Sequence, residues 1–467
     1  MSSFQLVTHR VSHRRDLLAL SLLAALIWLF FWKLAFTNLI IARGDIFTYF
    51  TPYRDFAAQA VREGRIPLWN PYLFMGAPFL ANSQAGVFYP LNWPLAWLDT
   101  ARAINWTIVL HVFIATSGVY VFARSRLALS IGAAFFAAMS FGLGGYLGTQ
   151  IEHVNQLQGL AWIGWIFLAY DRVSQADAGS TMQDARPRDF SRSLRAAFCI
   201  GLLALPIAFQ LLAGHTQTVF ISLIGLGVYA AYPAFETLFN KRSLASCLLH
   251  LASRLWPIAL ASIFAVTLSA IQLLPTLELT RESARSGGLT TNLAVSFSLD
   301  PRVIGRALLP DYAGAMPEGG EFTAFFSVTA LGLMTIGALR FTRSVMVRAV
   351  IIVTASGLLL AFGGYNPIYY LLLKVPGFDL FRAPARWIVL FVFAGSLLSG
   401  VGLDALRESF NRRWLSVPLL LTVVLIAATF ASAALTPPGT SGPLGTPDIS
   451  SLLLWLAPAV LFIYLVS

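Results

Sequence analysis

The sequence predicts an all-α polytopic membrane protein, and its composition, hydropathy and apolar runs all indicate this class. Of the 467 residues, 57% are hydrophobic and only 11% are charged, whereas soluble domains carry about 25% charged residues. The mean hydropathy is +0.72. A membrane-spanning helix needs about 20 apolar residues, and the chain contains about twelve runs of roughly that length. These runs lie near residues 17–41, 103–123, 129–149, 155–171, 196–213, 217–235, 255–274, 323–339, 347–362, 386–404, 415–435 and 451–467.

The distribution of basic residues predicts the orientation. The first apolar run follows Arg10, Arg14 and Arg15. It is too long for a secretory signal and lacks a convincing cleavage site, so we interpret it as a retained signal anchor. Cytoplasmic segments of membrane proteins are enriched in Lys and Arg, and with the N-terminus inside the whole net charge of +11 falls on inner segments. The chain is therefore predicted to be a multi-pass plasma-membrane protein with a cytoplasmic N-terminus, and nothing indicates nucleic-acid binding.

Two long outer segments, 42–102 and 275–322, are rich in Pro, Gly, Trp, Tyr and paired charges. Functional residues concentrate on such loops, so we expect an extracytoplasmic site. Residues 65–94 carry no charge after Arg65 and are dense in aromatics and amides. This stretch is either an interfacial aromatic belt or a surface that stacks on sugar rings and hydrogen-bonds their hydroxyls. The candidate substrate-binding side chains are Tyr53, which precedes this stretch, and Trp69, Asn70 and Gln84 within it.

The stretch G-D-I-F-T-Y-F-T-P-Y-R-D-F, residues 44–56, directly follows the first apolar run. Thr51 before Pro52 is typical of a helix N-cap followed by the first helical position. Apolar residues at helical spacing predict an amphipathic helix over 52–63, of the kind that lies in the headgroup plane. Such a helix would border a lipid-facing groove with Asp45 at its inner end.

Several motifs resemble one family. The run D-I-F-T-Y-F-T-P-Y-R-D, followed by G-R-I-P-L-W-N-P-Y-L-F-M-G-A-P-F-L-A-N-S-Q-A-G-V-F-Y-P-L-N, resembles the signature of bacterial YfhO-like membrane proteins, which are related to GT-C glycosyltransferases. A-G-H-T-Q (213–217), L-L-P-T-L-E-L-T-R-E-S-A-R (273–285) and F-R-A-P-A-R-W (381–387) extend the resemblance over most of the chain.

The resemblance implies one GT-C-like transmembrane domain over residues 1–467. It also implies an enzyme that takes a sugar from a polyprenyl-phosphate carrier on the outer leaflet and transfers it to an extracytoplasmic acceptor, such as a cell-wall polymer, lipid or glycan. Inversion at the anomeric carbon is the simplest outcome, because one in-line displacement suffices. Family members often continue well past this length, and the chain stops inside an apolar run, so a truncated C-terminus is expected.

The GT-C pattern implies one catalytic acid after the first span and a second acid between the third and fourth spans. Asp45 fits the first place, and Glu152 with His153, in T-Q-I-E-H-V-N-Q, fits the second. One acid would deprotonate the acceptor hydroxyl, and the other would orient the acceptor, the base or a divalent cation such as Mg²⁺ or Mn²⁺. Two non-catalytic alternatives stay open. In the first, Asp45 is a helix-end carboxylate paired with Arg43 or Arg54. In the second, Glu152 and His153 form a solvated turn.

A phosphate leaving group needs fixed positive charge at the outer headgroup level. Arginine suits this role, because its planar fork binds phosphate oxygens bidentately. Each candidate could equally be an arginine that anchors the chain at the membrane surface. The candidates are Arg54, Arg281, Arg285, Arg382 and Arg386.

Further polar residues fall on the outer side. A histidine at a helix end is often a structural hydrogen-bonder, and the acidic residues could hold the loop, a metal or an acceptor. The residues are His215, Gln217, Glu278, Glu318 and Glu321.

A lipid-linked glycan transporter or flippase would instead place ionisable groups near the midplane and show paired halves. Away from the span ends, Lys33 and His111 are the only charged or histidine residues within the predicted spans, and no repeat is evident. A non-catalytic membrane scaffold would leave the one-sided polar cluster unexplained.

Overall fold

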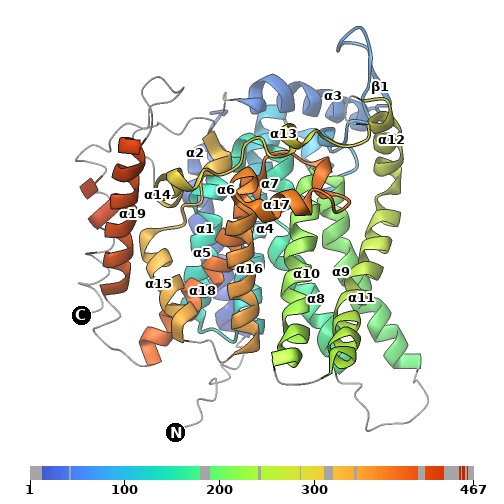
Figure 1. Cartoon of the computed structure of the whole chain (residues 1–467). Coiled ribbons are helices and arrows are strands. Elements are labelled where there is room, and N and C mark those ends of the chain that lie inside the picture. Colours follow the sequence, from blue (N-terminus) through green and yellow to red (C-terminus); the bar gives the residue numbers. More distant parts are fainter. Residues whose placement is uncertain are drawn as a thin grey trace. The chain divides into compact units, whose positions relative to one another are not determined.

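A computed structural model describes residues 13–41, 44–178, 190–239, 243–283, 286–309, 319–340, 344–408 and 416–435, with the short stretches 452–453, 455–457 and 460. Apart from one two-stranded hairpin, these residues form helices and connecting turns (Figure 1). The predicted all-α polytopic class is confirmed.

Six helices of the described chain are long and apolar enough to cross a membrane. They are Thr100–Arg126, Ile131–Glu152, Leu194–Leu212, Thr216–Leu238, Leu244–Leu268 and Pro384–Arg407. Three shorter apolar helices lie at further predicted runs, namely Val328–Leu339, Val345–Ala361 and Leu419–Ala431. The chain is therefore a multi-pass membrane protein by the length and composition of its helices.

Two other predicted runs, 17–41 and 155–171, are helical but interrupted. The helices there are α1 (His13–Phe30), α2 (Trp32–Phe36), α7 (Val154–Leu160) and α8 (Ile163–Ala178). The last run, 451–467, lies mostly outside the described residues. The predicted number of about twelve spans thus exceeds the six helices of the described residues that meet the length and hydropathy expected of a span.

The chain divides into two compact units. Unit 1 comprises Met1–Leu20, Val119–Gln150 and Gly288–Ser467, and unit 2 comprises Ser21–Gly118 and Ile151–Gly287. Helices α1 and α4 (Thr100–Arg126) contribute to both units. The single domain predicted over residues 1–467 stays a prediction.

Unit 1 is organised around α18 (Ile388–Glu408), and 89% of the 18-residue apolar window in its span is buried. The helices packed on it are α5 (Ile131–Gly142), α15 (Val328–Arg340) and α16 (Val345–Ala361). A Cβ at Gly402 would lie 1.9 Å from Leu333 O, so α15 and α18 meet backbone to backbone, as small residues permit between membrane helices. Flanking elements of this unit are α6 (Gly145–Thr149), α13 (Thr291–Ala294), η6 (Pro301–Val303), α14 (Ile304–Leu308), η7 (Gly319–Phe322), η8 (Gly363–Tyr365), α17 (Pro367–Leu372), η9 (Phe378–Leu380), η10 (Pro384–Trp387) and α19 (Ser416–Leu435).

An ion pair inside unit 1 joins α1 to α4. Asp16 accepts hydrogen bonds from Arg124 Nε and Tyr120 Oη, both at 2.7 Å. The Arg124 side chain is only 5% exposed. Asp16→Asn would leave this buried guanidinium without its counter-charge, so we expect a loss of about 2 kcal/mol of stability. Thermal unfolding of the purified protein should show a lowered midpoint, whereas Arg14→Gln, at an exposed position of α1, should melt like the parent.

Unit 2 contains a packed group of helices, α8 to α11, with α7 against α9 and α10. In Figure 1, α3 runs across the ends of α9 and α10. The remaining elements of this unit are η1 (Ile46–Phe50), α3 (Thr51–Arg62), β1 (Trp69–Asn70), β2 (Ala77–Pro78), η2 (Ser83–Ala85), η3 (Pro90–Asn92), η4 (Pro94–Trp97), α9 (Phe190–Leu212), α10 (Thr216–Phe239), α11 (Leu244–Leu268) and α12 (Ala270–Arg281). The strands β1 and β2 are antiparallel, with Trp69 opposite Pro78. η5 (Gln150–Glu152) bridges the boundary between the units.

Helix α3 confirms the helix predicted over 52–63, but its N-terminus differs from the prediction. The π turn η1 runs directly into α3, so Thr51 is already helical and donates its hydroxyl to Ile46 O at 2.7 Å. The prediction of Thr51 as the N-cap is therefore wrong. The preceding helical turn supplies a carbonyl for its hydroxyl, and no free helix end remains there to cap.

Candidate active site

Stacked aromatic rings fix α3 to the outer loop. The Tyr49 and Tyr53 ring centroids lie 4.2 Å apart, and those of Tyr53 and Phe79 lie 5.5 Å apart, with interplanar angles of 23° and 25°. Asn82 Nδ2 donates to Tyr49 Oη at 2.7 Å. Burial raises the pKa of Tyr49 to about 12, so its hydroxyl stays protonated at neutral pH. Tyr53, predicted to contact substrate, is the middle ring of this stack.

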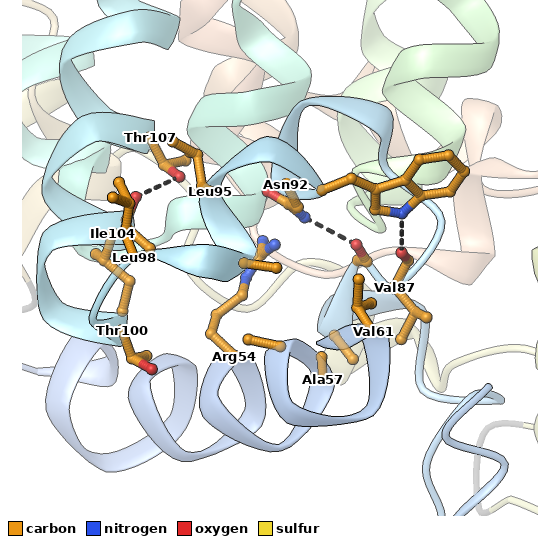
Figure 2. Close-up of a pocket in the computed structure, with 16 residues that line it drawn as sticks. Arg54, Ala57, Val61, Val87, Asn92, Leu95, Leu98, Thr100, Ile104 and Thr107 are labelled. Atoms are coloured by element: carbon orange, nitrogen blue, oxygen red, sulfur yellow. Dashed lines mark hydrogen bonds between the residues drawn. The ribbon is translucent and has the colours of Figure 1, made fainter. Parts of the chain in front are cut away.

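Arg54 points from α3 into the interior of unit 2. Its Nη2 donates to Gln158 Oε1 at 2.7 Å, and Gln158 Nε2 donates to Asn92 Oδ1 at 2.7 Å. Figure 2 shows the Arg54 side chain in a pocket between α3, the segment 85–98 and the first turns of α4. No ion pair joins Arg54 to Asp45 within the described chain, and Arg43 lies outside it. The alternative that Arg54 neutralises Asp45 therefore has no support.

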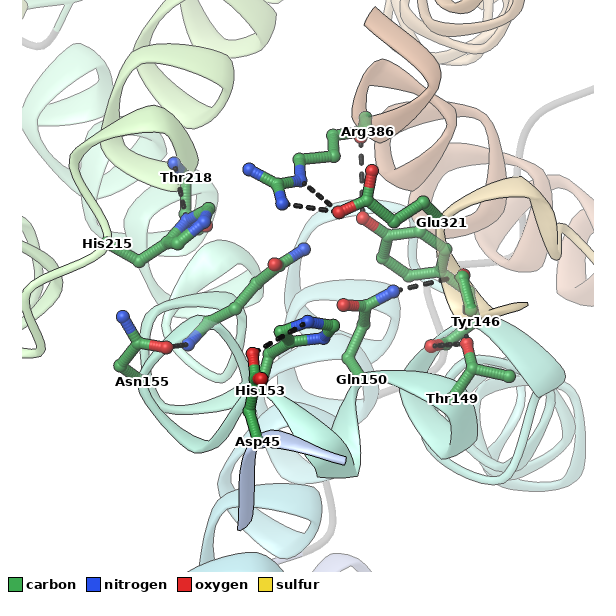
Figure 3. A network of polar contacts seen from close by, with 12 residues as sticks. Asp45, Tyr146, Thr149, Gln150, His153, Asn155, His215, Thr218, Glu321 and Arg386 are labelled. Atoms are coloured by element: carbon green, nitrogen blue, oxygen red, sulfur yellow. Dashed lines mark hydrogen bonds and ion pairs between the residues drawn. The ribbon is translucent and has the colours of Figure 1, made fainter. Parts of the chain in front are cut away.

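The two predicted acids approach the same place in unit 2. Asp45 Oδ2 lies 3.6 Å from His153 Nε2 (Figure 3). Glu152 lies against Gly44, the neighbour of Asp45, so closely that a Cβ there would meet Glu152 Oε2 at 2.7 Å. The side chains of Asp45 and His153 are 56% and 31% exposed. An accessible carboxylate beside an imidazole can accept a proton from an incoming hydroxyl.

The Asp45 side chain does not act as a helix cap. It stands immediately before η1, yet its side chain makes no capping hydrogen bond to that turn. Glu152 ends η5, and His153 precedes α7 without a side-chain cap. These three residues are thus placed by turns at helix ends, where side chains remain accessible.

Two buried polar atoms near this pair lack a hydrogen-bond partner in the described chain. They are His153 Nδ1 and Asn155 Nδ2. Asn155 is 2% exposed, and its Oδ1 already accepts from the Gln156 amide at 2.9 Å. A buried donor left unsatisfied costs about 1–3 kcal/mol, so we expect water or a bound ligand to complete these bonds.

His215 has a structural position in unit 2. Its Nδ1 accepts from Thr218 Oγ1 at 2.6 Å and from Thr218 N at 3.3 Å, which caps the first turn of α10. This bonding supports the structural alternative for His215. Gln217, in the same turn, is 6% exposed. The preceding Gly214 packs on the outer loop, where Ser83 Oγ donates to Gly214 O at 3.3 Å.

Of the sugar-contacting residues predicted in the outer loop, one is buried and two are exposed. Asn70 is buried, and its Oδ1 accepts from Tyr72 N at 2.9 Å, so its carbonyl serves the hairpin turn. Trp69 is 54% exposed and its ring covers Gly76. Gln84 lies within η2 and is exposed. Trp69 and Gln84 therefore remain accessible to a substrate.

Arg386 is held by Glu321 inside unit 1. Its Nε donates to Glu321 Oε1 at 3.0 Å, Nη2 contacts the same oxygen more closely, and the two side chains are 15% and 13% exposed (Figure 3). η7, which contains Glu321, packs against α6 and Gln150 of η5, where Thr149 Oγ1 and Gln150 Nε2 donate to Gly320 O at 3.0 and 3.1 Å. The Glu321 carboxylate thus neutralises the charge of Arg386. A phosphate would have to compete with Glu321 to bind this guanidinium.

The remaining predicted residues are more exposed or lie outside the described chain. Arg382 Cζ lies 5.5 Å from the centroid of the Phe297 ring, a cation–π arrangement. Arg281 ends α12, and Glu278 lies in the same helix, and both are exposed. Arg285 and Glu318 lie outside the described residues. The approach of Arg281, Arg382 or Arg386 to Asp45 stays a prediction.

Asp45 and Glu152 offer carboxylate oxygens, which Mg²⁺ and Mn²⁺ prefer. Within the described ranges, however, no group of three or more His, Cys, Asp or Glu side chains is gathered as metal ligands. The described residues do not complete a metal site on their own. The divalent cation stays a prediction, and no chemical step below runs through it.

One buried polar cluster was not predicted. His111 Nδ1 donates to Thr107 O at 2.6 Å, so its Nε2 accepts from Tyr89 Oη at 2.7 Å. Trp162 Nε1 in turn donates to Tyr89 Oη at 3.0 Å. Each of these donors has an acceptor. The hydrogen bonds therefore join α4, through His111, to Tyr89 of the outer loop and to Trp162, which directly precedes α8. A lone histidine inside an apolar run was its only sequence signal.

No family model matches the chain, and no curated protein matches it. Among solved structures, it is similar to ArnT from Cupriavidus metallidurans bound to undecaprenyl phosphate, with 11% identity, a TM-score of 0.49, and coverage of 96% of this chain and 70% of that one. It is also similar to the apo Archaeoglobus fulgidus oligosaccharyltransferase, with 14% identity, a TM-score of 0.45, and coverage of 97% and 55%. A third is the arabinofuranosyltransferase AftD from Mycobacteria, with 16% identity, a TM-score of 0.47, and coverage of 97% and 29%. The chain thus spans about half of the second protein and under a third of the third.

Proposed function

We propose that this chain is a GT-C-type glycosyltransferase that acts at the outer leaflet. It would move a sugar from a polyprenyl-phosphate donor to an extracytoplasmic glycan, lipid or cell-wall polymer. The observation that carries this proposal is the approach of Asp45 to His153, with the Glu152 carboxylate against Gly44. The resemblance of the surrounding motifs to YfhO-like proteins agrees with it, because the GT-C pattern places acids at these two positions.

Asp45 is the proposed general base. The acceptor hydroxyl oxygen attacks the anomeric carbon, and its proton passes to the Asp45 carboxylate. The bond between the anomeric carbon and the carrier phosphate oxygen breaks, and the electron pair leaves with the phosphate. A single in-line displacement of this kind inverts the anomeric centre. His153 orients the Asp45 carboxylate, and Glu152 positions the acceptor hydroxyl.

The leaving phosphate gains negative charge as its bond to the sugar breaks. Arginine guanidinium groups stabilise such charge best when they are fixed before the reaction. We assign this role to the group of arginines that includes Arg281, Arg382 and Arg386, with Arg54 on α3. In this proposal, a donor phosphate at Arg386 displaces Glu321 from the guanidinium.

The proposal is tested by transfer from a defined donor. Membranes or liposomes carrying the protein receive a radiolabelled polyprenyl-phosphate hexose, with extracted cell-envelope glycan as acceptor. We expect label to move into the acceptor only where the protein is present, with release of polyprenyl phosphate in equal amount. A panel of hexose and N-acetylhexosamine donors would identify the sugar.

The same preparation separates the enzyme from a flippase. Movement of the intact lipid-linked sugar across the bilayer, with no label in the acceptor and no released polyprenyl phosphate, would contradict the transferase and support transport. If neither transfer nor movement occurs with any donor in the panel, a scaffold role is favoured.

A further inference from the structure

The hairpin formed by β1 and β2 presents exposed aromatic side chains. Trp69, Tyr72 and Phe74 are 54%, 84% and 88% exposed, and we call these three residues the hairpin platform. The segment 66–98 contains no charged residue. Contiguous exposed apolar surface of this kind marks a site of interaction. The hairpin platform thus offers aromatic ring faces that carry no charge.

The turn of the hairpin is held in one conformation. A Cβ at Gly76 would lie 2.6 to 2.8 Å from three atoms of the Trp69 indole, so this ring packs against the turn. Phe74 and Met75 have φ values of +50° and +63°, which are rare for bulky side chains. Such conformations persist only where the surrounding structure holds them, and they cluster at ligand sites. A surface fixed before binding loses less conformational freedom when a ligand docks.

The hairpin platform lies on the aqueous side of α3. In Figure 1 the hairpin rises beyond α3, on the side away from α9 and α10. The apolar side of α3 packs on the protein, where Ala57 joins a core cluster with Phe79. The exposed side of the helix carries Asp55, Gln59 and Glu63. Polar side chains like these lie in water and not in hydrocarbon, so bilayer lipid is not the surface that the platform meets.

A row of aromatic rings leads from the hairpin along α3. The ring centroids of Tyr72 and Phe56 lie 6.3 Å apart, and those of Phe56 and Phe79 lie 4.8 Å apart. The stack of Phe79, Tyr53 and Tyr49 continues the row into η1. Phe56, Tyr53 and Tyr49 are half-buried, so part of each ring is accessible. The row therefore connects the hairpin platform with the turn that directly follows the candidate base.

The hairpin platform and Asp45 lie near opposite ends of this row. η1 and α3 together run from Ile46 to Arg62, and at about 1.5 Å per residue they span about 25 Å. A single sugar at Asp45 is too short to reach the platform, whereas a chain of several sugars contacts both places. Aromatic rings combine a large apolar face with a preferred geometry of contact, and the apolar faces of successive pyranoses repeat along such a chain.

We propose that the hairpin platform docks the acceptor, and that this acceptor is an uncharged glycan several sugars long, which lies along α3 with its reacting end at Asp45. The proposal rests on the proposed function, since it names the acceptor class of that reaction. At the base of the hairpin, Arg65 is already paired with Glu63 at 2.5 Å. This end of the surface therefore suits a neutral polymer better than an anionic one.

Glycan binding to the purified protein in detergent tests the platform without any donor. The probes are the neutral and the anionic fractions of extracted cell-envelope glycan, each separated into short and long chains and titrated by calorimetry. We expect long neutral chains to bind at least about tenfold more tightly, per chain, than short neutral chains or long anionic chains. Only the long neutral chains match both the length of the aromatic row and its lack of charge.

Two variants remove single rings of the hairpin platform. Trp69→Ala and Phe74→Asn should each weaken the long neutral chains by about tenfold. Asparagine adopts the left-handed conformation more readily than phenylalanine, so Phe74→Asn should fold at least as well as the parent and decides the test if Trp69→Ala unfolds. Trp69→Tyr keeps a ring and should restore most of the affinity. The matched control is Trp256→Ala, because Trp256 is 41% exposed but lies in the membrane-crossing helix α11.

Transfer kinetics give a second readout. Each platform variant should raise KM for long acceptors by about tenfold and leave kcat unchanged, since the platform does not contact the reacting atoms. Short acceptors should react with parental kinetics in both variants. A fall in kcat with short acceptors would show that the hairpin supports the fold of the candidate site and does not dock the acceptor.

Parental affinity in both Trp69→Ala and Phe74→Asn would overturn the platform. So would equal binding of short and long neutral chains, equal binding of the anionic fraction, or hairpin-dependent capture of an envelope protein without glycan binding. The failures of the two proposals are distinguishable. Transfer that ignores acceptor length and both variants removes the platform but keeps the transferase. Platform-dependent glycan binding, in a protein that transfers sugar from no donor, keeps the platform and removes the transferase.

Discussion

Asp45→Asn is expected to reduce sugar transfer by about 10²–10⁴-fold, which corresponds to about 3–5 kcal/mol of barrier. Asparagine keeps the size of the side chain but cannot take the proton of the acceptor hydroxyl. Asp45 makes no capping hydrogen bond, and its side chain is 56% exposed. Folding and membrane insertion should therefore stay near those of the parent, so that the loss appears in turnover alone.

The matched control is Asp55→Asn, ten residues further along the chain in α3. Asp55 is an exposed acid whose Oδ1 accepts from Thr100 Oγ1, and asparagine retains that acceptor. We expect near-parental transfer from this variant and a change in stability below about 1 kcal/mol. Initial rates with a labelled polyprenyl-phosphate sugar, normalised to the amount of folded protein, give the comparison. Near-parental transfer by Asp45→Asn would return Asp45 to a non-catalytic membrane-edge residue.

The helices were largely predictable, because the length of an apolar run determines whether a segment can span a bilayer. Runs such as 103–123 and 386–404 contain few charges and became single long helices. The run at 155–171 was predicted as one continuous span, but its helix is interrupted at Ala161 and Trp162, a turn that hydropathy does not register. The N-cap at Thr51 failed for a related reason, since the preceding π turn has no distinct sequence pattern.

The motif resemblance named the two acids of the candidate site, but the hydrogen-bond partners of the other polar side chains could not be predicted. Asp45 and Glu152 were both named, and the structure places Glu152 against the neighbour of Asp45. The bond from Arg54 to Gln158 was not foreseen, because it joins residues far apart in the chain. Pairing of buried polar groups depends on tertiary packing, so residue type and local spacing do not specify it.

Gly214→Ala is expected to destabilise the protein by about 4 kcal/mol, from backbone strain of about 1–3 kcal/mol and overpacking of a similar size. Gly214 has φ +83°, a conformation that side-chain-bearing residues rarely adopt. A Cβ there would also lie 1.9 Å from Ser83 O and 2.4 Å from Ser83 C. Both are backbone atoms, so the loop at 82–84 would have to move, and with it the Asn82 bond that holds Tyr49.

Gly227→Ala provides the matched control for this prediction. Gly227 lies inside α10, and a Cβ there meets nothing within 4 Å, so alanine should be neutral or stabilise the helix by about 0.5–1 kcal/mol. Thermal unfolding in detergent should give a clearly lower midpoint for Gly214→Ala than for Gly227→Ala. Transfer at a temperature where both proteins remain folded should also fall for Gly214→Ala, because the displaced loop carries the ring stack that fixes α3. Equal midpoints would show that the loop does not pack on Gly214 as described, and would remove the link between this turn and the candidate site.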